Sequence, residues 1–457
     1  MSVNPELLRN LWLEATPFRL IQILGLSLVV FAVSSAAPRN LLTLEGAAMA
    51  LYWFFVVLWG TRNAALSVVS EIRERTWDSQ KLSAVSPRTM MWGKLLGATS
   101  ANWFGGLLCL PLILFAAWRD AGPLSAIAFG IILLALGLFA QGVALLSSLV
   151  LIRRNTGNWR LDTFLCQIAG IGAAFAYYSL WSSVDAFEAT GARSLVWWGH
   201  EFGLTGFHFT SLMIFLGWTL LGVWRAMRAE LRFANGPFVW LAYLAYLAFY
   251  SAGFESTISG YLASFSMTED ATLLHAAAVR LGLASIALLS TAYSMVFLEP
   301  KDPVRLRWLG EHFRAGQYYK AFLALDAWML SYGVIMIAGL VLAGLLAMDG
   351  AMVGSLPAFA LAPGVLAMLG FLTRDVAIFV LMRGLAGAKG DFAALALLAA
   401  LYLVIPAALH RAGLDLQFLL VPVASGAAAF GVAAAWAQGV GVMVLALRSI
   451  KRRDESV

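Results

Sequence analysis

Long runs of apolar residues, separated by short polar segments, fill most of this chain. A helix needs about 20 predominantly apolar residues to cross the hydrocarbon core of a bilayer. By this criterion the pattern predicts twelve transmembrane helices. The first six cover residues 20–37, 47–70, 95–118, 124–151, 164–185 and 206–227, and the second six cover residues 237–254, 273–298, 326–348, 357–383, 392–410 and 416–447. The pattern leaves open whether the seventh and twelfth include re-entrant segments.

The composition agrees with this interpretation. Of the 457 residues, 61% are hydrophobic and 12% are charged, whereas soluble domains have about half apolar and about a quarter charged residues. We therefore expect an all-α polytopic membrane protein. The net charge of +6 does not indicate nucleic-acid binding. The basic residues lie at the ends of the apolar segments, where they set topology and meet lipid headgroups.

The distribution of Lys and Arg tests the number of spans. With both termini in the cytoplasm, 26 of the 31 basic residues fall in or next to cytoplasmic segments. The other five fall near the outer ends of spans: Arg39, Arg119, Arg193, Arg280 and Arg411. An error of one span would exchange the predicted sides of the following loops and remove this excess of cytoplasmic Lys and Arg. The excess is the one that the positive-inside rule describes. The sequence therefore predicts an even number of spans and two cytoplasmic termini.

The N-terminal residues predict a helix that precedes the first span. Asn4 is a suitable N-cap, with Pro5 at the first helical position. A helix that starts there has one apolar face, as expected of a segment that lies in the plane of the membrane interface. That face is formed by Leu7, Leu8, Leu11 and Trp12.

A dense charged segment, EIRERTWDSQKLSAVSPRTMMWGKLL, covers residues 71–96, between the second and third spans. Its spacing predicts a short helix outside the membrane. In that helix Glu71 and Arg75 are i,i+4 partners, and Trp77 and Leu82 offer apolar contacts. An ordinary solvated loop is the alternative interpretation.

The end of this segment predicts a return to the bilayer. Ser86-Pro87 breaks the helix, because the residue before proline disfavours the helical conformation. Gly93-Lys94 then leads into the third span. The loop is therefore assigned residues 71–94.

The order E-x-R-E-R-T-x-D-x-x-x-L-S-x-x-S-P, followed by G-K and an apolar helix, resembles the cytoplasmic loop of ABC-2 type ABC transporter permeases. In that family the loop is a coupling helix that docks on the ATPase subunit, and an elbow helix often precedes the first span. The common family form has Gly before the Thr, where this chain has Arg75, and often Glu where Asp78 stands. The resemblance implies ATPase-coupling roles for Glu71, Arg73, Glu74, Arg75, Thr76, Trp77, Asp78 and Gln80.

The twelve spans divide into two sets of six near Asn235-Gly236-Pro237. We expect one half at residues 1–236 and the other at 237–457, each with its largest cytoplasmic loop after its second span. Family permeases usually have six spans and pair as dimers, so two halves in one chain imply two docking helices. A homo- or hetero-oligomer and a monomer both remain open.

The second loop covers residues 299–320 and does not share the motif of the first. Asp302 is a suitable N-cap with Pro303 at the first helical position, and Gly316 is a suitable stop. Val304, Trp308, Leu309 and Phe313 are expected to form its apolar face. The coupling residues expected in this loop are Asp302, Arg305, Trp308, Glu311 and Phe313.

The outer segment at residues 185–205 is expected to form a short re-entrant or surface helix, as in the resembled family. The pair Trp197-Trp198 within it is typical of an interfacial aromatic belt.

No phosphate-binding loop of the form G-x-x-x-x-G-K-[ST] and no H-E-x-x-H motif occurs in the sequence. We therefore expect no catalytic, cofactor-binding or metal-ligating residues in this chain, and ATP with Mg²⁺ on a partner ATPase. An intramembrane enzyme is disfavoured, because no nucleophile-and-base or metal constellation stands out.

Arg374 and Asp375 are the notable intramembrane charges. As neighbours in a helix they are not expected to face each other, so each needs another partner or a water-filled cavity. An interhelical ion pair that fixes packing is the favoured interpretation, and a proton relay is the alternative.

We expect the chain to be the permease subunit of an ATP-driven exporter in the inner membrane of a bacterium, in contact with lipids and a cytoplasmic ATPase. The alternative is a twelve-span, ion-coupled secondary transporter. Against it stand the scarcity of mid-membrane carboxylates and the absence of the loop motif of the major facilitator class. The sequence does not identify the substrate.

Overall fold

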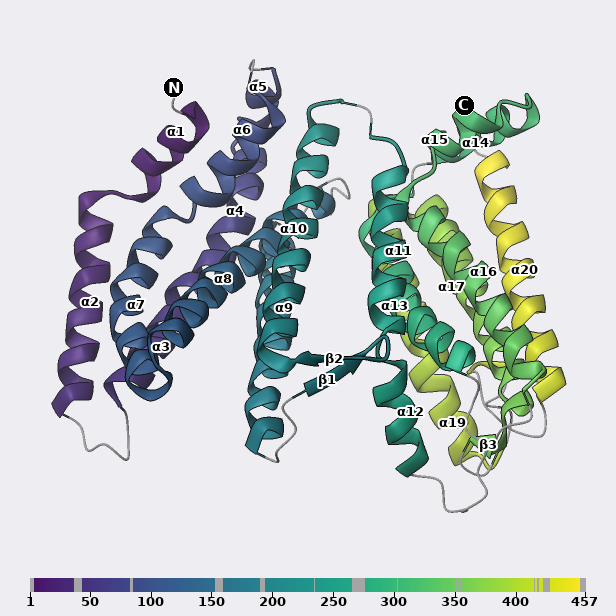
Figure 1. Ribbon diagram of the computed structural model, residues 1–457. Coiled ribbons are helices and arrows are strands. Elements are labelled where there is room, and N and C mark those ends of the chain that lie inside the picture. Colours follow the sequence, from purple (N-terminus) through teal and green to yellow (C-terminus); the bar gives the residue numbers. More distant parts are fainter. Residues whose placement is uncertain are drawn as a thin grey trace. The chain divides into compact units, whose positions relative to one another are not determined.

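The computed structural model describes residues 4–36, 43–82, 85–152, 159–189, 194–233, 235–264, 276–301, 303–349, 352–353, 356–414, 416, 419–421 and 428–452. Within these residues the chain is almost entirely helical, with only four short strands (Figure 1). The predicted all-α fold is therefore confirmed.

Ten helices in the described part of the chain are long and apolar enough to cross a membrane. The other two predicted spans, the fifth and the seventh, are also helices but are not among these ten. The fifth lies in α9 (Trp159–Ala189), which has 31 residues, and the seventh in α11 (Phe238–Ala252), which has 15. At 1.5 Å per residue, α11 is shorter than the roughly 30 Å hydrocarbon core. The chain is a polytopic membrane protein.

The chain forms two compact units. Unit 1 consists of Met1–Ser194 and Gly203–Asn235, and unit 2 of Leu195–Phe202 and Gly236–Val457. The division after Asn235 lies one residue from the boundary expected from the sequence. Residues 195–202 are the exception, because they belong to unit 2 although they precede the boundary.

Unit 1 is built from helices that pack around α8. Its core places Tyr52, Phe55 and Val56 against Cys109 and Leu133, and the Tyr52 hydroxyl donates to the Leu133 carbonyl at 2.7 Å. The elements are α1 (Pro5–Glu14), α2 (Pro17–Ala36), α3 (Leu44–Tyr52), η1 (Trp53–Trp59), α4 (Gly60–Arg73), α5 (Trp77–Lys81), α6 (Pro87–Trp92), η2 (Gly93–Gly97), α7 (Ser100–Ala121), α8 (Pro123–Ile152), α9 and α10 (Leu204–Glu230).

The second span of unit 1 contains a π-helical segment, η1, between α3 and α4. Two carbonyls of this segment accept hydrogen bonds from glutamine side chains of neighbouring helices. Gln141 donates to the Val56 carbonyl and Gln167 to the Leu58 carbonyl, both at 2.9 Å. The buried Gln141 therefore has a structural role, since a lone polar group at this depth is costly unless it is hydrogen-bonded.

Unit 2 is centred on α17, where 72% of the most apolar stretch is buried. Its helix α20 approaches closely, because a Cβ atom at Gly439 would lie 2.8 Å from the Gly370 carbonyl oxygen. The elements are β1 (Ser194–Trp197), β2 (His200–Gly203), α11, α12 (Glu255–Ser264), α13 (Ala276–Leu298), α14 (Pro303–Arg314), α15 (Tyr318–Leu323), α16 (Ala327–Ala347), β3 (Met352–Val353), β4 (Leu356–Pro357), η3 (Ala358–Ala360), α17 (Ala362–Ala386), η4 (Gly387–Lys389), α18 (Gly390–Ala399), η5 (Ala400–Val404), α19 (Ile405–Arg411) and α20 (Ala428–Arg452).

The prediction of a surface or re-entrant helix at residues 185–205 is wrong for residues 194–203. Residues 194–203 form the two strands β1 and β2, joined by a turn in which Trp198 and Gly199 have φ of 51° and 75°. The indole of Trp197 donates to the Tyr250 carbonyl at 3.0 Å. Because the turn needs two positive φ values, which are the mark of a tight hairpin turn, a helix cannot continue through it.

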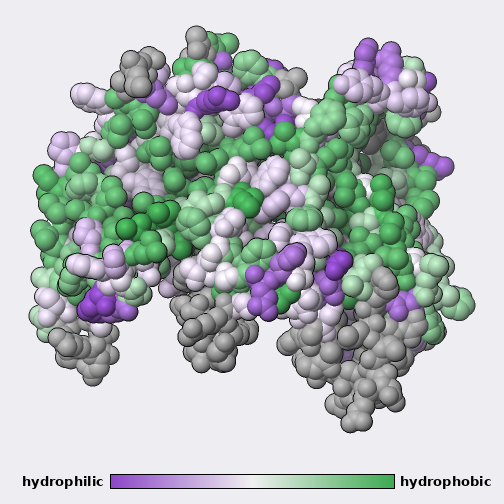
Figure 2. All heavy atoms as spheres, in the orientation of Figure 1, coloured by the Kyte–Doolittle hydropathy of each residue, from purple (hydrophilic) through white to green (hydrophobic). Residues whose placement is uncertain are grey.

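Apolar side chains cover the flanks of the helices, as expected where they meet lipid. Phe18, Ile21 and Val29 on α2 are each more than half exposed. On the face drawn in Figure 2, hydrophobic residues lie along the sides of the helices and hydrophilic residues gather at helix ends, including the region of α14. This pattern supports membrane embedding.

Candidate functional site at the first loop

The helix α4 ends where the coupling motif begins. The Thr76 N–H donates to the Glu71 carbonyl at 2.9 Å, and the Arg75 N–H to the Ile72 carbonyl at 3.1 Å. These two bonds form a Schellman motif, and Arg75 accordingly has a left-handed φ of 59°. The predicted i,i+4 pair of Glu71 and Arg75 is therefore wrong. The helix α4 ends at Arg73, so Arg75 is not on the helical face of Glu71.

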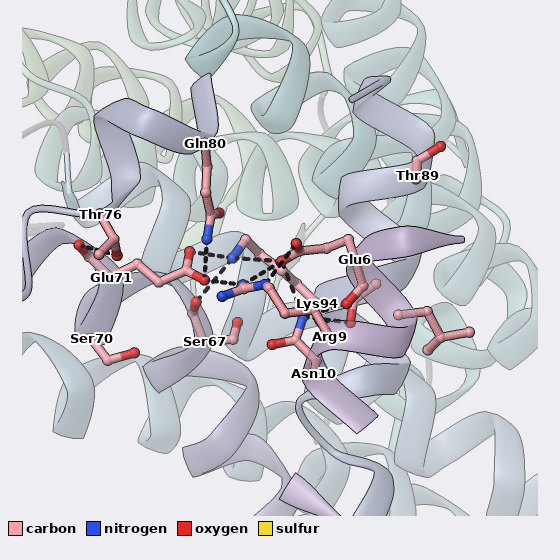
Figure 3. A network of polar contacts seen from close by, with 12 residues as sticks. Glu6, Arg9, Asn10, Ser67, Ser70, Glu71, Thr76, Gln80, Thr89 and Lys94 are labelled. Carbon is pink, nitrogen blue, oxygen red and sulfur yellow. Dashed lines mark hydrogen bonds and ion pairs between the residues drawn. The ribbon is translucent and has the colours of Figure 1, made fainter. Parts of the chain in front are cut away.

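Glu71 instead is the centre of a buried polar network (Figure 3). One carboxylate oxygen, Oε1, accepts from Arg9 and from Gln80, the latter at 2.6 Å. The other, Oε2, contacts the ammonium of Lys94. Lys94 also donates to the Ser67 carbonyl at 3.2 Å. One side chain at the end of α4 thus joins α1, α5 and the start of the third span, η2.

The helix α1 takes part through its polar side. Its N-cap and Pro5 start are as predicted, with the Leu7 N–H donating to Asn4 Oδ1 at 3.0 Å. The buried residues of α1 are Glu6 and Asn10, whereas Trp12 is 82% exposed. Polar residues therefore face the protein and apolar residues face outward, which suits a helix at a lipid interface.

Two glycines let α1 lie directly on η2. A Cβ atom at Gly93 would be 2.5 Å from Glu6 Cγ, and one at Gly97 would be 2.7 Å from Asn10 Cβ. The four-residue spacing of these glycines is the small-xxx-small pattern that allows close helix packing in membranes. Asn10 also donates to the Gly93 carbonyl at 3.2 Å.

The network balances its charges. Two carboxylates, Glu6 and Glu71, share two cations, Arg9 and Lys94, and Lys94 is fully buried. Burial acts to raise the pKa of Glu6, but hydrogen bonding from Arg9 and the charge of Lys94 outweigh it and hold that pKa below its ordinary value. The hydrogen bond from Arg9 to Glu6 raises the pKa of the guanidinium. Both shifts favour the charged forms of Glu6 and Arg9.

The short helix α5 lies over this network. Trp77 is only 3% exposed, and Lys94 Nζ lies 5.1 Å from its ring centroid. Gln80 and Thr76 point toward Glu71, and Thr76 Oγ1 donates to the Glu71 carbonyl at 3.2 Å. The predicted apolar partner Leu82 is instead 89% exposed.

The other predicted coupling residues form the outer surface of the loop. Asp78 is 86% exposed and lies 3.3 Å from Lys81. Arg73 and Glu74 are half-exposed and 3.3 Å apart. The first loop therefore divides its predicted residues into an inner group (Glu71, Trp77, Gln80) and an outer group (Arg73, Glu74, Arg75, Asp78). Thr76 is exposed as well, although its hydroxyl is bonded to the Glu71 carbonyl.

The predicted break and re-entry follow this helix as expected. Ser86 caps α6 by accepting from the Thr89 N–H at 3.2 Å, with Pro87 at the first helical position. The chain then enters η2 at Gly93.

The second loop is arranged differently. The predicted helix is present as α14 with Pro303 at its first position, while Asp302 lies outside the described residues. Gly316 has φ 69° and ends the helix, as predicted. Arg305 forms an ion pair with Asp326 at 2.8 Å.

The remaining residues predicted there do not form one apolar face. The rings of Trp308 and His312 are tilted by 43° with their centroids 4.0 Å apart, and Phe313 lies 5.2 Å from Tyr318 in an edge-on contact. Glu311 is exposed. Because Val304 and Phe313 are nine residues apart, the helical period places them on opposite sides of α14.

The intramembrane pair also differs from expectation. Arg374 Nε donates to Asp375 Oδ1 at 3.0 Å, so the two neighbours do interact, because the long arginine side chain reaches the adjacent carboxylate. Each also has the further partners that were expected. Asp375 Oδ2 accepts from Tyr293 at 2.8 Å and Tyr402 at 2.7 Å, and Arg374 Nη1 donates to Gln438 at 3.1 Å.

Sequence reasoning missed Glu6, Arg9, Asn10 and the burial of Lys94. The signals were present: polar residues at positions 6, 9 and 10 share one side of an amphipathic helix, and GKLLG has the spacing of a close helix contact. Only the fold shows that these two features face each other.

No family model, curated protein or solved structure matches this chain. Within the described residues, no group of three or more His, Cys, Asp or Glu side chains is placed to hold a metal ion.

Proposed function

We propose that this chain is the transmembrane permease subunit of an ATP-driven ABC transporter, an exporter, and that a separate ATPase docks on the surface of α5. The resemblance of the 71–94 loop to the coupling loop of ABC-2 permeases suggests the partner. The observation that carries the proposal is the Glu71 network, because it gives that loop a firm mechanical link to the spans.

A docked ATPase would meet the outer group of the first loop. This surface presents both signs of charge, from Arg73, Glu74 and Asp78, together with the exposed Leu82. Mixed charge around an apolar contact suits a protein partner, because charge complementarity sets register while the apolar residue contributes affinity.

Movement of α5 would pass to three elements at once. Trp77 is buried beneath the helix, and Gln80 binds Glu71 directly. Glu71 in turn holds Arg9 on α1 and Lys94 at the start of the third span. A displacement of the loop therefore moves the end of α4, the elbow helix and η2 together, which is what rigid-body coupling requires.

The secondary-transporter alternative depends on Asp375 as an exchangeable proton site. Asp375 is fully buried, and three donors occupy its two oxygens. This arrangement favours a structural ion pair, because proton exchange would break several hydrogen bonds in a low-dielectric interior. We therefore retain the carrier as the second candidate only.

The test is ATPase coupling in the full complex. The permease is co-expressed with ATPases from its operon or genome, and the Glu74→Lys/Asp78→Lys variant is compared with the natural chain. We expect permease-dependent stimulation of ATP hydrolysis to fall at least tenfold, as for loss of about 1.4 kcal/mol of interface energy, while membrane insertion is unchanged.

The proposed interface is confined to the first loop and leaves out Glu311, which the sequence had suggested as a coupling residue of the second loop. Glu311→Lys is therefore the matched control, because it reverses an exposed acidic charge outside that interface. It should leave stimulation intact. If no ATPase co-purifies and transport follows an ion gradient alone, the proposal fails and the carrier takes its place.

A further inference from the structure

The α14–α15 segment differs from the first loop in what it exposes. Phe313 is 63%, Tyr318 62% and Tyr319 68% exposed, whereas the tryptophan of α5 is buried. Trp308 is 45% exposed as well. Four large aromatic side chains within 12 residues are thus available on the outside of this segment.

Basic residues accompany these aromatics. Residues 303–320 contain a single acidic side chain, Glu311. The basic side chains of the same stretch are Arg305, Arg307, Arg314 and Lys320. The first loop, by contrast, has both signs on its outer surface. An aromatic and net basic segment complements an anionic lipid surface, because Trp and Tyr prefer the headgroup region and Lys and Arg are attracted to anionic lipids.

The chain also keeps this segment beside the membrane. Four residues separate α13 from α14, and three separate α15 from α16, so even fully extended they reach roughly 10–15 Å. Leu306 packs against the core of unit 2, and Arg305 is held by Asp326 and by the Ala324 carbonyl. Figure 1 shows α14 and α15 across the ends of the unit 2 helices.

We propose that the α14–α15 segment is a lipid-docking surface that binds anionic phospholipid headgroups through Arg307, Arg314 and Lys320 and inserts Phe313, Tyr318 and Tyr319 at the interface. This assignment does not depend on the proposed ATPase partner. It replaces the second ATPase contact that the sequence suggested.

The experiment measures how far the segment is shielded from water. The full chain, with Cys109 and Cys166 replaced by Ala, carries Gln317→Cys labelled with a fluorophore, in nanodiscs of phosphatidylcholine with or without phosphatidylglycerol. Acrylamide, a neutral quencher, reports water access. We expect phosphatidylglycerol to lower the quenching constant at position 317 about threefold at low salt, and high salt to reverse this.

Two controls separate the proposal from general effects. The variant Arg307→Gln/Arg314→Gln/Lys320→Gln should lose the response, while the Arg305 ion pair and the fold stay intact. A label at Leu82→Cys in the first loop should be quenched equally in both lipids. Equal quenching of position 317 in both lipids would overturn the proposal. So would shielding that arises only when an ATPase is added, since it would assign this surface to the ATPase.

Discussion

Glu299 accepts a hydrogen bond from the backbone N–H of Trp328, 29 residues later, at 2.9 Å. Glu299 follows α13 and Trp328 lies in the first turn of α16, so one carboxylate holds together the helices on either side of the second loop. In unit 1, Glu71 at the end of α4 holds Lys94 at the start of the third span. Both units therefore fasten the two ends of their largest loop with a glutamate, although the loops share no motif.

The Glu71–Lys94 contact predicts a strong dependence on the buried ammonium. Lys94→Met should destabilise the protein by about 3–5 kcal/mol, because two carboxylates are left with a single cation inside the fold. Thermal unfolding in detergent measures this. Asp78→Asn, which removes an ion pair at a carboxylate that is 86% exposed in the same loop, should cost only about 0–1 kcal/mol. Equal losses from the two variants would contradict the network.

The close contact between α1 and η2 predicts a steric effect of substitution at Gly97. Gly97→Leu should push α1 away from η2 at a cost of about 1–3 kcal/mol, because its Cβ would meet Asn10. Faster proteolysis of the N-terminal segment in proteoliposomes would report the displacement. Gly25→Leu on α2, where no atom lies within 4 Å, is the matched control and should leave proteolysis unchanged.

The left-handed conformation of Arg75 predicts a stabilising substitution. Arg75→Gly should raise the free energy of unfolding by roughly 1 kcal/mol. In the left-handed region a residue with a Cβ atom is destabilised relative to glycine by about this amount. Arg73→Gly, inside the last turn of α4, should cost about 1 kcal/mol instead. If both glycines destabilise the protein alike, the turn does not have this geometry.

The lowered pKa of Glu6 predicts an acid-sensitive α1. Since the folded state favours the carboxylate, its stabilisation is present above the ordinary pKa of glutamate and is lost as pH falls through the folded-state value. Water access of a label on α1 should therefore rise at acid pH. Glu6→Gln should abolish this transition, and a transition of unchanged midpoint in that variant would assign it to another group.

The donors to Asp375 predict a structural rather than a proton-transfer role. Tyr402→Phe should lower stability by about 1.5–3 kcal/mol, as for loss of a hydrogen bond to a charged group, and Asp375→Asn should reduce folded yield. Size-exclusion profiles and transport at several pH values check both effects. A normal yield with steep loss of pH-dependent transport would instead identify Asp375 as a proton site.

The fold class could be predicted from sequence because lipid imposes a simple rule of length and apolarity on each span. The N-cap at Asn4, the break at Ser86-Pro87 and the helix stop at Gly316 were also predictable, since they depend on local residues alone. The partners of Glu71 were not, because Arg9 and Lys94 are 62 and 23 residues away. The Trp198-Gly199 turn was missed because an apolar segment of this length suits a strand or a helix equally well.

The π-helical segment η1 has a consequence for the orientation of Glu71. The Gly60 N–H bonds the Phe55 carbonyl five residues back, so this part of the span holds more residues per turn than an α-helix. A π-helical segment holds extra residues within its turns. If these residues were wound as α-helix, the part of the helix that follows would be rotated about its axis by about 100° for each such extra residue. Gln141 and Gln167 donate hydrogen bonds to carbonyls of this segment. By stabilising its π-helical winding, they therefore help to determine the direction in which the Glu71 carboxylate points, several turns further along the helix.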